Sequence, residues 1–261
     1  MKNHLMQALA DSSGTWSGSH LGQHSFIFKI ADKIIAFDPF LTPVDGRLQP
    51  PFIPAEEFEN VDIIFGSHDH GDHIDRPSLA AMAAASPRAV FVFPQAVIDS
   101  ITEIPHDRIC GLNDGMTVEI SGVKITGIAA AHELLEPTPE GLYPCLGFVV
   151  EYAGKTLYHS GDCCIYEGLQ TKLSSWHFDL MMLPINGRDA DRYRTGCIGN
   201  MTFQEAVDLA GVLKPELVWP AHYDMFPGNL ADPLDFLKYL QVKYPGVKSQ
   251  LPPTGKVRIL P

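Results

Sequence analysis

Long hydrophobic runs and a surplus of basic residues are both missing from these 261 residues. No apolar run approaches the about 20 residues that a membrane-spanning helix needs. The apolar stretch 5–10 is also too short for the core of a signal peptide. Lysine and arginine number 19 against 31 aspartates and glutamates, so the formal charge is −12. Because no basic footprint offsets phosphate repulsion, we expect neither a membrane nor a nucleic acid as partner.

Cysteine is scarce as well, with five residues and no C-x-x-C pair. The odd number and the spacing favour neither a disulfide framework nor a thiolate zinc site. Reduced thiols in a cytoplasmic protein are the simplest interpretation. Cys163 and Cys164 are adjacent, and the sequence leaves open whether they lie near a metal or are ordinary buried thiols.

The rest of the composition is that of a globular protein, with 45% hydrophobic and 19% charged residues. Apolar runs separated by short polar turns predict antiparallel hairpins, followed by alternating strands and helices. This order favours an α/β fold with two mixed β-sheets flanked by helices. No linker or repeat divides the chain, so we predict one domain over 1–261, with 1–15 as an N-terminal extension. The predicted hairpins cover 25–37, 116–129 and 147–159.

Two local signals predict elements in the last third of the chain. Thr202 and Glu205 have the spacing of a capping box, which predicts a helix from this point to about Leu213. Residues 256–260 predict a strand that closes a sheet edge. The polar segment 184–200 between these elements and the preceding strand is expected to be a loop.

The densest cluster of chemically versatile side chains is the segment 67–75, which reads SHDHGDHID. It follows the apolar run 61–65, which predicts a buried strand, and Pro77 then opens a helical stretch. The segment is therefore expected on a strand-to-helix loop, a common position for functional groups.

The spacing within this segment predicts ligands for two metal ions. His68 and His70 are one residue apart, so an extended backbone lets both imidazoles converge on one ion. Asp72 and His73 follow on the turn and point towards a second ion. Neutral imidazole and carboxylate are suitable ligands for zinc and similar divalent ions.

A two-metal site needs more ligands than this segment supplies. His132, Asp162 and His222 each follow the carboxyl end of a predicted strand. Folds of the α/β class place their sites at such strand ends. We therefore include these three residues among the predicted ligands.

The ordered set H-x-H-x-D-H, then His, Asp and His, resembles the metallo-β-lactamase superfamily of hydrolases, over roughly residues 16–240. The resemblance implies a four-layer αββα sandwich with a dinuclear site between the sheets. It also implies how the ligands divide between the two ions. His68, His70 and His132 would hold one ion, Asp72, His73 and His222 the other, and Asp162 would bridge both.

Shorter pieces are similar to the L-ascorbate-6-phosphate lactonase family: LYHSGD at 157–162, the segment 67–75, and Ala-Asp-Pro at 231–233. The chain is shorter than that family's members, and Cys163-Cys164 replaces polar residues there. The similarity implies a small anionic ester or lactone as substrate, such as L-ascorbate 6-phosphate, and a homo-oligomer. It also makes Mn²⁺ a candidate for the two divalent ions per chain, whereas histidine-rich ligation suits Zn²⁺.

Two aspartates are the expected catalytic residues. Two cations lower the pKa of a shared water and supply hydroxide near neutral pH. Asp72 would accept the proton and orient the nucleophile, while Asp162 would set the distance between the ions.

Substrate contacts are expected mainly from the segment 184–200, because arginine suits bidentate capture of phosphate or carboxylate. The alternative is a solvated loop whose arginines pair with Asp189 and Asp191. A further candidate is a histidine at the start of the first predicted strand, which lines the pocket mouth or is structural. The predicted substrate-binding residues are Asn186, Arg188, Tyr193, Arg194 and His24.

Three other functions remain in view. A phosphodiesterase of the same superfamily is one, although the negative charge counts against a polynucleotide substrate. A flavoprotein-coupled di-iron oxidoreductase carries Glu at the second ligand position, where this chain has His70. A non-catalytic metal-binding protein is expected to lack one or more ligands, and all seven are present here.

Overall fold

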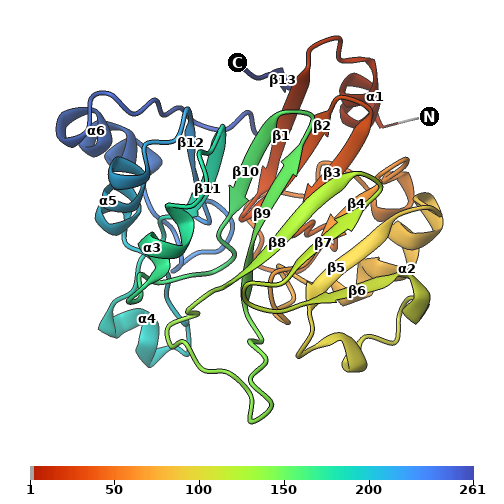
Figure 1. Cartoon of the computed structure of the whole chain (residues 1–261), viewed down its shortest axis with the longest axis horizontal. Coiled ribbons are helices and arrows are strands. Elements are labelled where there is room, and N and C mark those ends of the chain that lie inside the picture. The colour runs from red at the N-terminus through yellow and green to blue at the C-terminus, as the bar shows by residue number, and fades with distance from the viewer. Residues whose placement is uncertain (1–2) are drawn as a thin grey trace.

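Two β-sheets lie face to face in the computed structural model, which describes residues 3–261, and helices cover their outer faces (Figure 1). Residues 1 and 2 of the predicted N-terminal extension lie outside the described part. The first sheet has seven strands in the order β13 (Arg258–Ile259), β1 (Trp16–Gly22), β2 (Ser25–Ile30), β3 (Lys33–Phe37), β4 (Ile63–Phe65), β5 (Val90–Pro94) and β6 (Ile109–Leu112). The second has six strands in the order β12 (Val218–Ala221), β11 (Leu180–Pro184), β10 (Lys155–His159), β9 (Leu146–Tyr152), β8 (Val123–Ala129) and β7 (Thr117–Ile120).

The helices lie on the outside of the two sheets. Figure 1 shows α3, α5 and α6 beside the second sheet, and α2 beside the first. The α-helices are α1 (His4–Asp11), α2 (Arg76–Ala85), α3 (Leu169–Leu173), α4 (Ala190–Arg194), α5 (Phe203–Leu213) and α6 (Pro233–Lys243). Short 3₁₀ turns are η1 (Ala55–Glu57), η2 (Ile98–Ser100) and η3 (His106–Arg108). No helix in the described range is both long and apolar enough to cross a bilayer.

Both sheets are mixed, which sets where strand ends meet. Strands β3 to β6 are parallel, and so are β10, β11 and β12. Strand β9 is antiparallel to both β8 and β10, so β8, β10 and β12 all run in the same direction. Their carboxyl ends therefore share one edge of the second sheet, which is where α/β proteins place their sites.

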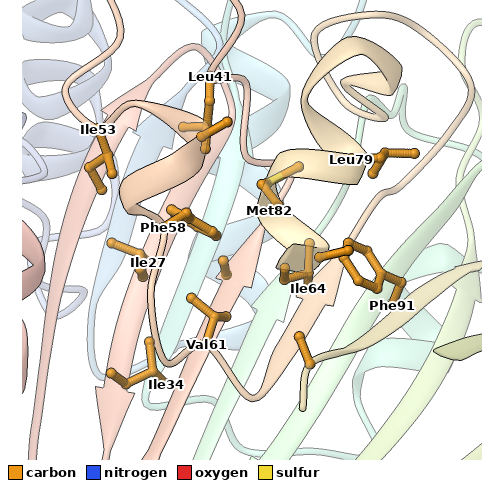
Figure 2. Packing of buried hydrophobic residues seen from close by; sticks show 14 of the residues in the cluster. Ile27, Ile34, Leu41, Ile53, Phe58, Val61, Ile64, Leu79, Met82 and Phe91 are labelled. Atoms are coloured by element: carbon orange, nitrogen blue, oxygen red, sulfur yellow. The ribbon is translucent and has the colours of Figure 1, made fainter. Parts of the chain in front are cut away.

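Three layers of apolar side chains hold the four layers of backbone together. The middle layer lies between the sheets, where Trp219 on β12 stacks within 5.9 Å of Phe26 and 5.8 Å of Phe28. One outer layer packs α3, α5 and α6 on the second sheet. The other lies between the first sheet and α2, with Ile64, Leu79 and Phe91 among its members (Figure 2). This arrangement is the predicted αββα sandwich.

Helix α1 contributes to that last layer. Asn3 caps the helix by accepting hydrogen bonds from the backbone N–H groups of the next turn. Leu5, Met6 and Leu9 are buried against the first sheet's outer core. The described part of the N-terminal extension is therefore packed on the fold and is more than a surface linker.

The sequence-based elements are largely confirmed, and the capping box is present in full. The Thr202 hydroxyl accepts the Glu205 N–H at 3.3 Å, and the Glu205 carboxylate accepts the Thr202 N–H at 2.9 Å. Strand β13 pairs with β1 at the sheet edge, as expected. Three elements were not predicted: β1, β6 and α4. All seven residues of β1 are buried, so this strand shows none of the alternation that reveals a half-buried strand.

Candidate metal centre

All seven predicted ligands meet at one edge of the sandwich. His68 and His70 follow β4, and Asp72 and His73 lie on the turn that leads into α2. The other three follow the parallel-running strands of the second sheet. They are His132 after β8, Asp162 after β10 and His222 after β12.

Three imidazoles converge at the first candidate ion position. Nε2 of His68 lies 2.9 Å from Nδ1 of His70, which lies 3.2 Å from Nε2 of His132. These three nitrogens form a group compact enough to hold one ion.

A second group consists of Asp72, His73 and His222. Oδ2 of Asp72 lies 3.5 Å from Nε2 of His73 and 3.7 Å from Nε2 of His222. His222 adopts a left-handed backbone conformation with φ of 57°, which turns its side chain back over the end of β12. The second group therefore combines one carboxylate with two imidazoles.

The Asp162 carboxylate lies between the two groups. Its Oδ2 is 3.8 Å from Nε2 of His132 and 3.1 Å from Nε2 of His222. Its Oδ1 is 3.5 Å from Nε2 of His73. One carboxylate thus faces histidines of both groups, as a bridging ligand must.

Burial and charge shift the pKa values of these groups in different directions, and the first imidazole group is neutral before any ion binds. Burial holds the pKa of His68 well below its usual range and lowers that of His132 to about 4, so both imidazoles are neutral. Burial also lowers the pKa of His73 and His222, but the Asp162 charge helps outweigh this effect and raises both values. Burial raises the pKa of Asp162, yet His222 and His73 bring it well below its usual range.

The donor set fits a pair of divalent ions. Nε2 of His73 is buried and has no hydrogen-bond partner, although buried polar atoms rarely lack one. Imidazole nitrogens and ionised carboxylates are the donors that zinc and similar divalent ions take. An ion at this position would satisfy the orphaned nitrogen.

A buried carboxylate beneath the site orients His73. Asp38 has no exposed surface, and its Oδ2 accepts a hydrogen bond from Nδ1 of His73 at 2.6 Å. Asp38 also accepts from the Ser67 hydroxyl at 2.6 Å and from the Ser67 N–H at 2.8 Å. Holding the proton on Nδ1 leaves Nε2 free to bind an ion, which is the usual carboxylate–histidine–metal arrangement.

Two of the predicted substrate-binding residues are already paired with other side chains, although Arg188 also lines the pocket described below. Arg188 pairs with both Glu205 oxygens at 2.6 and 2.7 Å, so its fork is already occupied. Asn186 is 2% exposed, and its amide bonds the side chains of Asn200 and Asn229. The residue types in this segment suggested substrate contacts, but residue type does not determine which way a side chain turns.

The pairing with Asp189 and Asp191, expected under the alternative for segment 184–200, is present for its other arginines, on a helix and not on a loop. Arg192 lies 3.2 Å from Asp189, and Arg194 lies 3.4 Å from Asp191. These pairs belong to α4, which Asp189 caps by accepting the Arg192 N–H at 2.9 Å. Tyr193 and Arg194 nevertheless remain largely exposed and line a pocket of about 470 Å³.

His24 lies beneath the site and not at a pocket mouth. It has no exposed surface, its Nδ1 is 3.4 Å from Oδ1 of Asp162, and its ring stacks 4.1 Å from that of His159. Burial lowers the pKa of His24 to about 4. As placed here, His24 supports Asp162 and has no surface with which to contact a substrate.

Three residues near the centre were missed in the sequence. Gln23 reaches Asp72 from the turn between β1 and β2, and Glu133 and Cys197 line the adjoining pocket. Gln23 and Glu133 each stand beside a histidine, but no spacing rule distinguishes them from ordinary polar residues. Only the fold brings these three residues to the site.

A sequence profile for the beta-lactamase superfamily domain matches residues 34–223. The fold and the site define a metal-dependent hydrolase of the metallo-β-lactamase superfamily. A UPF0173 metal-dependent hydrolase of Pyrococcus abyssi is 31% identical over 223 residues, covering 84% of this chain and 89% of the relative. The chain belongs to the UPF0173 family of metal-dependent hydrolases.

Solved structures share the fold at lower identity. Igni18, a metallo hydrolase from Ignicoccus hospitalis, has a TM-score of 0.73 at 22% identity, covering 93% of this chain and 97% of that one. The isothiocyanate hydrolase from Delia radicum gut bacteria has a TM-score of 0.69 at 16% identity, covering 94% and 99%. These similarities support the four-layer architecture.

Proposed function

We propose that this protein hydrolyses a small ester or lactone that carries an anionic group, using two divalent ions, zinc or manganese. The observation that carries the proposal is the meeting of two ligand groups around the shared Asp162 carboxylate. Bound ions would supply Lewis acidity and lower the pKa of water, so that hydroxide forms near neutral pH.

Asp72 is the proposed proton acceptor. Its carboxylate is 21% exposed, whereas Asp162 is only 4% exposed, so Asp72 is the site carboxylate that a substrate can approach. Burial raises the pKa of Asp72, but His73 and His222 outweigh this effect and keep the group ionised. An ionised carboxylate at the edge of the site can orient the attacking water and accept its proton.

The pocket of about 470 Å³ at α4, whose lining includes the neighbour of His132 in the sequence, is the proposed substrate site. Glu133 directly follows His132 and lines the pocket wall together with Cys197. Burial raises the pKa of the Cys197 thiol, so this side chain is a neutral part of the pocket wall. A volume of about 470 Å³ suits a small molecule.

We expect two divalent ions per chain, because two compact ligand groups are present and the Asp162 carboxylate faces histidines of both. Elemental analysis of protein purified without chelator, followed by titration with Zn²⁺ and Mn²⁺, measures this number. Uptake of a single ion by well-folded protein, even with excess metal, would contradict the two-ion site. His70→Ala is a useful comparison, since it should weaken only the ion held by the three imidazoles.

Arg194→Ala should raise KM for a phosphorylated lactone roughly three- to tenfold, since an exposed charge contributes about 1 kcal/mol. Its side chain is 78% exposed, lines the pocket, and has only a long contact with Asp191. An unphosphorylated lactone of the same size should show little change. Steady-state kinetics on both substrates provide the measurement.

Arg188→Ala is the matched control for this prediction. Arg188 lines the same pocket, but Glu205 already occupies its fork, so the substitution should lower the thermal midpoint without discriminating between the two lactones. If Arg194→Ala impairs hydrolysis of both lactones equally, Arg194 does not bind the anionic group. That result would not contradict the proposal that the protein is a metal-dependent hydrolase of such substrates.

A further inference from the structure

The turn between β1 and β2 directs one amide side chain into the metal centre. Gln23 occupies the left-handed region with φ of 55°, where a residue other than glycine is uncommon. Its N–H donates to Asp224 at 2.8 Å, and its carbonyl accepts the His222 N–H at 2.7 Å. His20 adds a contact from Nε2 to the same carbonyl at 3.1 Å. The backbone is therefore anchored independently of the side chain.

The Gln23 side chain contacts two predicted ligands of the second ion. Its Nε2 lies 2.7 Å from Oδ2 of Asp72 and 3.1 Å from Nε2 of His222. The side chain is 1% exposed, and its Oε1 is buried without a hydrogen-bond partner. A buried amide oxygen without a partner calls for an explanation, because native folds pair such atoms.

Rotation by half a turn about the last side-chain torsion of Gln23 exchanges the positions of Oε1 and Nε2. Two ligand atoms bound to one ion at about 2.0–2.2 Å lie roughly 3.0–3.5 Å apart. The terminal Gln23 atom lies 3.1 Å from Nε2 of His222, within this range, and 2.7 Å from Oδ2 of Asp72, somewhat closer. An oxygen in that position would point a lone pair at the place where those ligands converge.

We propose that the amide oxygen of Gln23 is a further protein ligand of the ion held by Asp72, His73 and His222. The proposal rests on the two-ion site of the proposed function. Ion binding turns the amide, so that Oε1 gains the partner it lacks and the hydrogen bond from Nε2 to Asp72 is released.

This ligand would make the two ion positions chemically unequal. The first position is lined by the imidazoles of His68, His70 and His132, which suit zinc. The second would gain a carbonyl oxygen beside the carboxylates of Asp72 and Asp162, and oxygen ligands suit manganese. Mixed occupancy by zinc and manganese follows from this difference.

The variants Gln23→Glu and Gln23→Leu distinguish a metal-ligand role of Gln23 from a hydrogen-bond donor role. Both variants and the wild type are stripped with chelator, loaded with one equivalent of Zn²⁺, and titrated calorimetrically with Mn²⁺. For a ligand, Gln23→Leu should weaken the second ion at least tenfold, whereas Gln23→Glu should bind it as tightly as wild type or more tightly. The Mn²⁺ EPR spectrum should change in Gln23→Glu, since one ligand has become a carboxylate.

If Gln23 is only a hydrogen-bond donor, the Mn²⁺ affinities of the two variants should rank in the opposite order. If Gln23 only donates to Asp72, Gln23→Glu places two carboxylates together and should weaken the second ion at least as much as Gln23→Leu does. That order overturns the proposal, and so does unchanged Mn²⁺ affinity in both variants. Should Gln23→Leu fail to fold, the direction of change in Gln23→Glu decides alone. A wild type that takes up only one ion overturns both this proposal and the two-ion site.

Asn186→Leu is the matched control. Asn186 is also a buried amide, but its partners are Asn200 and Asn229, and it contacts none of the predicted ligands. Its Mn²⁺ affinity should equal that of wild type, even if its thermal midpoint falls. A comparable loss of Mn²⁺ affinity in Asn186→Leu would show that any buried amide change disturbs the site, and this result overturns the ligand role.

Discussion

Asp162→Ala is expected to lower hydrolysis by at least about 10³-fold, because this carboxylate faces both ligand groups and ion stabilisation is worth several kcal/mol. Its oxygens lie 3.1 Å from His222, 3.5 Å from His73 and 3.8 Å from His132. The metal content should fall in parallel. Far-UV circular dichroism should remain that of wild type, because the three apolar layers do not depend on this side chain.

Turnover, metal content and circular dichroism need to be measured on the same preparation. Asp162→Asn is the matched variant, since it keeps the shape of the side chain but removes its charge. It should lose most of the activity as well, because a neutral amide is a weaker bridge between two cations. Wild-type turnover in Asp162→Ala would remove this residue from the site.

Asp38→Ala should destabilise the protein by about 3–5 kcal/mol, the cost of breaking a buried pair by removing one partner. The change leaves Nδ1 of His73 and the N–H of Ser67 without their acceptor in a region that water does not reach. It also removes the group that orients His73, so metal affinity should fall roughly 10- to 100-fold. Urea unfolding and metal titration measure the two effects.

Asp75→Asn provides the control for Asp38. Asp75 is also nearly buried and accepts hydrogen bonds from Leu41 and from Thr42, at 2.6 to 2.8 Å. The Asp75→Asn substitution should lower the stability of the protein but leave its metal affinity close to that of wild type. Equal metal affinities in Asp38→Ala and wild type would contradict the orienting role of Asp38.

Local spacing determined much of the site. The H-x-H-x-D-H segment places its ligands relative to one another through a few covalently linked residues, so their convergence needs only a loop at a strand end. His132, Asp162 and His222 are predictable for a related reason: strands that run in parallel bring their carboxyl ends to one edge. Apolar periodicity and the Thr202–Glu205 capping box likewise depend on neighbouring residues alone.

The tertiary structure decided which side chains turn towards the centre and which are already paired. The sequence predicted that Arg188 binds an anionic group of the substrate. In the fold, α5 places Glu205, 17 residues further along the chain, where it pairs with Arg188. His24 looked like a pocket residue, but the second sheet covers it and brings Asp162 within 3.4 Å.

Gln23 shows most directly which contacts cannot be predicted from the sequence alone. Its contacts with Asp72 and His222 span 49 and 199 residues, and they exist only because two sheets pack face to face. Strand β1 was missed for the same reason, since burial on both faces erases its alternation. The sequence by itself predicted which histidines and aspartates come together, and the layers of the fold, because these follow from short-range spacing and strand direction. The partners of each polar side chain were decided by long-range packing, which leaves no periodic pattern along the chain.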